Sequence, residues 1–153
     1  MKGIMFNEKY GLESAVLNGT KTRTWRADKQ PRYKVGEIVA IKQRYKDVCD
    51  YCLMQGKVNY LNLINHTGWL NKMFVQNESM PYQIRITAVK KCKLQDLTDE
   101  ECIKEGIEVF STIMQGHYET PKLAFGFLIY SLNGKGYWES NPDGYAYEFE
   151  LVK

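Results

Sequence analysis

Two segments in which apolar and polar side chains alternate with a two-residue period constrain the fold of this chain most strongly. In residues 82–93, Ile84, Ile86 and Ala88 fall on one side of an extended chain. In residues 145–151, three aromatic residues and a leucine alternate with alanine and glutamate. A helix would distribute these side chains around its axis, so both segments are predicted to be half-buried strands.

Shorter signals predict helices and further extended segments around these two strands. Asn7 is a suitable N-cap, Gly19 stands where a helix often ends, and Thr98-x-x-Glu101 forms a capping box. Pro121 is typical of the first turn of a helix. The expected helices are residues 8–18, 99–105 and 121–132, and the expected extended segments are residues 20–26 and 38–41. Because these elements follow one another without a regular βαβ rhythm, the sequence predicts an α+β fold with a mostly antiparallel sheet or a small barrel.

The chain shows no feature that would divide it into separate domains. It has no repeat, low-complexity run or linker-like composition, and its 153 residues fit one domain of ordinary size. We therefore expect a single domain over residues 1–153. Residues 46–80 mix polar and apolar side chains without a clear period and are predicted to be an insertion with short local structure.

The composition excludes several classes of protein. With 44% hydrophobic and 25% charged residues, the chain is typical of an ordered globular domain rather than a disordered one. Its longest charge-free apolar run is about half of the ~20 residues that a membrane span needs, and residues 1–8 lack the apolar core of a signal peptide. We therefore expect a cytoplasmic protein without a membrane partner. The net charge of +3 is low for a nucleic-acid coat protein but still allows a small basic cleft.

The cysteines do not predict a metal site. Cys49 and Cys52 have the spacing of a zinc-ligand pair, but no second pair of this kind exists. Further possible ligands are Cys92, Cys102, His66 and His117. We expect all four cysteines to be reduced thiols, with no metal and no cofactor.

Three segments, in this order, resemble the ASCH domain family. Residues 17–26, LNGTKTRTWR, are similar to the family signature Gly-x-Lys-Thr-x-Thr-x-Arg that follows the first helix. Residues 35–37, VGE, resemble its Gly-Asp turn before a strand, and residues 84–107 resemble its strand, its Leu-Thr-x-Glu helix start and its Glu-Gly close. Residues 130–136 and 138–142 also look like the tail of phage- and prophage-type members, although Asp143-Gly144 replaces the aromatic pair that follows Asn-Pro there.

The resemblance implies a fold and a chemistry. The fold is a PUA-like domain, a small mixed and mostly antiparallel β-barrel with peripheral helices. One enzyme of the family type is an amidohydrolase that removes the acyl group from N4-acetylcytidine. Matched residue by residue, its proton acceptor, nucleophile and proton donor fall on Lys21, Thr24 and Glu105. A nucleoside or RNA is the implied partner.

These three roles place conditions on the structure. A threonine hydroxyl needs a base to take its proton, and a lysine is a base only if burial or nearby cations keep it neutral. On a regular strand Lys21 and Thr24, three residues apart, would lie on opposite faces, so a turn or bulge is required just after Gly19. Glu105 falls in the last turn of its helix, where the helix dipole disfavours a negative charge, as suits a proton donor.

Three non-catalytic interpretations remain open at this stage. Residues 20–26 form an ordinary threonine-rich surface strand if their composition reflects only strand propensity. The same segment can instead serve a non-catalytic RNA-binding module, in which basic side chains hold phosphates and tryptophans stack on bases. A protein-interaction module is a further alternative. The residues predicted to contact a nucleoside or RNA are Gly19, Thr22, Arg23, Arg26 and Trp138.

Overall fold

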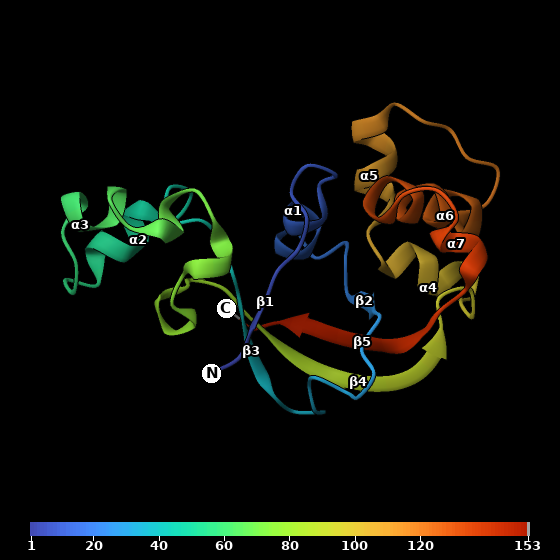
Figure 1. The fold of residues 1–153 in the computed structure, drawn as a ribbon, viewed down its shortest axis with the longest axis horizontal. Coiled ribbons are helices and arrows are strands. Elements are labelled where there is room, and N and C mark those ends of the chain that lie inside the picture. The colour runs from blue at the N-terminus through green and yellow to red at the C-terminus, as the bar shows by residue number, and fades with distance from the viewer. Residues whose placement is uncertain (153) are drawn as a thin grey trace. The chain divides into compact units, whose positions relative to one another are not determined.

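The strands form one open, mixed sheet in a computed structural model that describes residues 1–152 (Figure 1). The order of the strands across the sheet is β1-β3-β4-β5-β2. β1 pairs with β3 in parallel, whereas the β3–β4 and β2–β5 pairs are antiparallel. The strands are β1 (Gly3–Ile4), β2 (Arg23–Arg26), β3 (Ile38–Ile41), β4 (Gln83–Lys93) and β5 (Asp143–Leu151).

The predicted barrel, PUA-like and mostly antiparallel, is wrong. β1 and β2 are the two ends of the strand order, and within residues 1–152 they do not pair with each other. Closing a barrel requires edge strands long enough to be paired along their length. β1 has two residues and runs parallel to its neighbour, so it offers no edge of that kind. The alternation in β4 and β5 correctly identified two strands, but it carries no information about which strands end the sheet.

Three helices occur where the local signals predicted them. α4 (Asp99–Lys104) begins with the expected capping box, in which the Thr98 and Glu101 side chains each bond the other residue's backbone amide. α6 (Pro121–Asn133) differs from its prediction by one residue. α1 (Leu12–Leu17) begins four residues later than expected, because Gly11 adopts a left-handed conformation with φ of 77°. Asn7 consequently caps a turn through Tyr10 rather than the helix itself.

By the packing of its backbone, the described chain divides into two compact units. The first contains residues 1–6 and 38–85 together with the C-terminal residues from Leu151. Its residues 46–80 form short elements: α2 (Cys49–Met54), α3 (Tyr60–Ile64), η1 (Thr67–Trp69), η2 (Lys72–Phe74) and η3 (Asn77–Ser79). Cys52 lies in the core of this unit beside Tyr45 and Leu63. Within residues 1–152 no three side chains are placed to hold a metal ion, and the four cysteines are free thiols.

The second unit contains residues 7–37 and 86–150 and carries all eight predicted site residues. In Figure 1 its helices α4, α6, α5 (Ile107–Met114) and α7 (Tyr137–Ser140) lie together, and α6 packs against the other three. Phe110, Phe125 and Leu128 are fully buried among these helices. None of the helices described in residues 1–152 is long and apolar enough to cross a membrane.

Candidate functional site

Lys21 lies in a turn between α1 and β2 rather than in the strand. The backbone amides of Thr20 and Lys21 both bond the Ala15 carbonyl, and Gly19 has a φ of 84°. β2 begins only at Arg23. The turn that the spacing of Lys21 and Thr24 requires is therefore present, directly after Gly19.

The turn brings Lys21 to the end of α4, where Glu105 is the C-cap residue. Lys21 Nζ donates to the Glu105 carbonyl at 2.8 Å, to the Arg23 carbonyl at 2.7 Å and to Glu105 Oε1 at 3.3 Å. Gly106 allows this close approach: a Cβ at that position would lie 3.3 Å from Lys21 Cβ. These three contacts use the three N–H bonds of a protonated lysine.

Arg23 holds the other oxygen of the Glu105 carboxylate. Its Nη1 lies 2.8 Å from Glu105 Oε2, and its Nη2 lies 3.4 Å from Glu101 Oε2. The backbone amide of Trp25 adds a 3.4 Å bond to Glu105 Oε1. Lys21, Arg23, Thr24 and Glu105 are each at most 5% exposed. The result is a buried network in which each oxygen of one carboxylate faces a cation.

Burial changes the acid–base properties of Lys21. Desolvation lowers the pKa of Lys21 from 10.5 to about 8, because a charged ammonium is costly away from water. The neighbouring charge of Glu105 opposes this change, and the positive charges of Arg26 and Arg23 add to it. Close to pH 8 a large fraction of Lys21 is therefore neutral, which a general base requires.

Thr24 faces away from Arg23 because successive side chains of a strand leave on opposite sides. It pairs in register with Tyr147 of β5, and its Oγ1 accepts a 3.2 Å hydrogen bond from Arg26 Nε. Tyr147 in turn donates to Asp28 Oδ2 at 2.7 Å. An arginine N–H at Oγ1 stabilises negative charge that develops on this oxygen.

The structure separates the remaining predicted contact residues. The Thr22 carbonyl accepts a hydrogen bond from the Phe149 amide in the pairing of β2 with β5. Gly19 borders open space, since no atom lies within 4 Å of a Cβ built on it. Trp138 stands in α7 and lines a cavity of about 560 Å³ on α6, a different place from the Lys21 network. Trp25 is a core residue that donates its indole N–H to the Cys92 carbonyl.

Sequence reasoning missed two members of the site region. Glu101 was identified only as part of a capping box, yet its carboxylate also pairs with Arg23. Tyr147 was identified only as an apolar strand position, yet its hydroxyl joins Asp28 to the Arg32 backbone amide. No local pattern signals either contact, because both join residues distant in the sequence.

Comparison with known proteins adds little. No family model and no curated protein matches this chain. Among solved structures, the crystal structure of protein EF3133 from Enterococcus faecalis V583, of family DUF984, is similar over 99% of this chain and 77% of that chain. The identity is 14% and the TM-score is 0.45, and at these values the similarity assigns neither a family nor a function.

Proposed function

We propose that this protein, as an ASCH-type domain of the cytoplasm, binds a nucleoside or an RNA base beside β2 and removes the acyl group from an N4-acylated cytidine. The observation that supports this best is the contact of Lys21 Nζ with Glu105 Oε1 at 3.3 Å, together with a Lys21 pKa lowered to about 8. The substrate class comes from the resemblance of residues 17–26 and 84–107 to the ASCH family.

In the proposed reaction the Thr24 hydroxyl attacks the acyl carbon while neutral Lys21 accepts its proton. Protonated Lys21 passes this proton to the Glu105 carboxylate, which its Nζ contacts at 3.3 Å, and Glu105 delivers it to the cytidine nitrogen as the carbon–nitrogen bond breaks. Water cleaves the resulting threonine ester, which releases the carboxylic acid and restores Thr24.

Arg26 controls access to the nucleophile in this scheme. Its Nε already bonds Thr24 Oγ1, and its partly buried side chain lies beside a hydroxyl that is itself almost fully buried. A substrate therefore reaches Thr24 only when Arg26 moves. The arginine then remains close enough to stabilise the oxyanion that forms during attack.

The test is release of cytidine from N4-acetylcytidine, followed by chromatography. The wild type and a Thr24→Ser variant, which keeps a hydroxyl, are expected to release cytidine. Thr24→Val, which has almost the same shape, is expected to lose at least about 10³-fold in rate because it lacks the nucleophile. The amidohydrolase proposal fails if the wild type forms no cytidine, or if Thr24→Val is as fast as the wild type.

A non-catalytic RNA-binding module is the second candidate function. Lys90 and Lys91 are exposed near the end of β4 and are available for phosphates. In addition, the three acceptors around Lys21 Nζ suit its charged ammonium form, which cannot act as a base. This alternative predicts affinity for single-stranded RNA that falls steeply with salt, and no release of product.

A further inference from the structure

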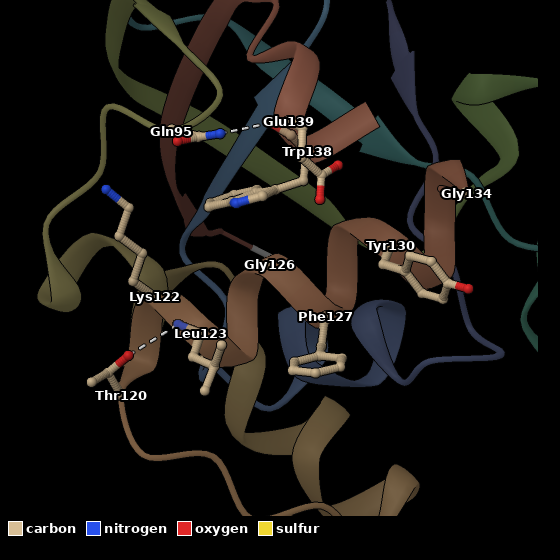
Figure 2. A pocket seen from close by; sticks show the side chains of 10 residues that line it. All are labelled: Gln95, Thr120, Lys122, Leu123, Gly126, Phe127, Tyr130, Gly134, Trp138 and Glu139. Carbon is tan, nitrogen blue, oxygen red and sulfur yellow. Dashed lines mark hydrogen bonds between the residues drawn. The ribbon is translucent and has the colours of Figure 1, made fainter. Parts of the chain in front are cut away.

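A groove on the second unit has no role in the proposed reaction. It has a volume of about 560 Å³ and lies between α6 and α7, as Figure 2 shows. This size falls in the range of ~300–1,000 Å³ that is typical of small-molecule sites. Its walls combine aromatic and aliphatic side chains with a few polar ones. The residues that the argument uses are Gln95, Lys122, Leu123, Phe127, Tyr130 and Trp138.

The wall that carries Trp138 is held in place by polar contacts. Gln95 Nε2 donates to the Trp138 carbonyl at 2.7 Å, and the Gln95 amide donates to Asn141 Oδ1 at 2.9 Å. The indole packs edge-on against Phe125 at 5.9 Å between ring centroids. In Figure 2 it lies over α6 at Gly126, where a side chain of any size would contact it. The ring is thus held in position by the fold and is partly exposed.

The wall of the groove that α6 forms exposes a row of large, mainly apolar side chains. Leu123, Phe127 and Tyr130 follow one another at helical spacing along α6 and are 45–57% exposed. Half of each side chain, at ~200 Å² for a large residue, gives roughly 300 Å² in total. A stable dimer needs about 800 Å² on each partner, so this surface is too small for a second copy of the chain. It suits a small molecule.

Charge at the rim indicates what kind of molecule fits. Lys122 lines the groove, and among residues 1–152 no carboxylate forms an ion pair with it. In Figure 2 Lys122 extends on one side of the Trp138 indole, while the Glu139 carboxylate lies on the other. An anionic group at Lys122 is therefore separated from the acidic residue by the ring itself.

We propose that this groove binds a small molecule made of a planar aromatic ring and one anionic substituent. The ring lies against Trp138 and the apolar side chains of α6, and the anion pairs with Lys122. Nucleoside phosphates and aromatic carboxylates share this chemistry. The site is independent of the Lys21–Thr24–Glu105 network and does not depend on the function proposed for it.

Titration calorimetry on the full chain tests the proposal, with cytidine 5′-monophosphate and indole-3-acetate as anionic probes and cytidine as the neutral one. At least one anionic probe is expected to bind, and more tightly than cytidine. Lys122→Met is expected to weaken that binding about tenfold, whereas Lys135→Met, on the exposed loop nearby, leaves it unchanged. Trp138→Leu is expected to abolish it.

Three results would overturn the groove as a ligand site. They are no binding of either anionic probe, equal affinities in Lys122→Met and Lys135→Met, or binding that is lost in Thr24→Val but kept in Trp138→Leu. The last result would place the ligand at the Lys21 network instead. If Trp138→Leu does not fold, the comparison of the two lysine variants decides alone. Binding that Trp138→Leu loses and Thr24→Val keeps supports the groove even where the wild type deacylates nothing.

Discussion

Replacing Glu105 with alanine is expected to lower the free energy of unfolding by about 3–5 kcal/mol. The carboxylate is the partner of both Lys21 and Arg23, and all three side chains are buried. Its removal takes the carboxylate away from buried Lys21 and leaves buried Arg23 with only the 3.4 Å contact to Glu101. Burying a charge without a partner costs much more free energy than a surface ion pair contributes, which is ~0–1 kcal/mol.

Thermal and urea unfolding measure this effect. For a chain of this size the loss corresponds to a fall in Tm of roughly 10 °C or more. Glu100→Ala is the matched control, because Glu100 is exposed in the first turn of the same helix and its loss costs less than about 1 kcal/mol. Changing Lys21 to methionine together with Glu105 to leucine is expected to recover part of the loss, since fewer buried charges then lack a partner. Equal stability of the Glu105→Ala and Glu100→Ala variants would show that the network contributes nothing.

Replacing Lys21 is expected to stop the release of cytidine while the protein stays folded. Loss of a general base lowers the rate by about 10²–10⁴-fold. Two variants distinguish the role of Lys21 as a base from the role of its positive charge. Lys21→Met removes both, whereas Lys21→Arg keeps a positive charge that cannot be deprotonated at ordinary pH. Both are expected to be inactive if Lys21 is the base.

Lys104→Met controls for the loss of a lysine in the same region. Lys104 is exposed at the end of α4, where its ammonium lies 3.4 Å from the Glu148 carboxylate. This variant is expected to release cytidine at the rate of the wild type. An active Lys21→Arg variant would contradict the base role, because only the charge of Lys21 would then be needed.

Local signals predicted seven of the helices and strands, while contacts between distant residues gave no local signal. The apolar run 38–41 coincides with β3, and the capping box at Thr98 set the start of α4. The two-residue strand β1 is too short to show any period, and without its parallel pairing the open edge of the sheet was not foreseeable. α5 follows α4 directly, because Gly106 at a φ of 95° ends one helix and begins the next.

In the candidate site, too, the contacts between distant residues were the part that the sequence did not predict. Resemblance pointed to Lys21 and Glu105, and their Nζ and Oε1 atoms are 3.3 Å apart in the structure. The 17–26 segment does not show that Arg23 turns inward to the same carboxylate, because a strand of four residues has no recognisable buried face. Nor does the sequence show that Trp138 lies at the groove on α6, away from the Lys21 network. That placement depends on how α7 packs on α6.

The pH dependence of kcat/KM for N4-acetylcytidine tests the central claim most directly. Below its pKa of about 8 Lys21 is protonated and cannot accept the proton of Thr24. The rate of the wild type is therefore expected to rise about tenfold per pH unit and to level off near pH 8, with no such rise in Lys21→Met. A rate that is independent of pH between 6 and 9, on the order of that of Lys21→Met, would contradict a catalytic role for the buried lysine.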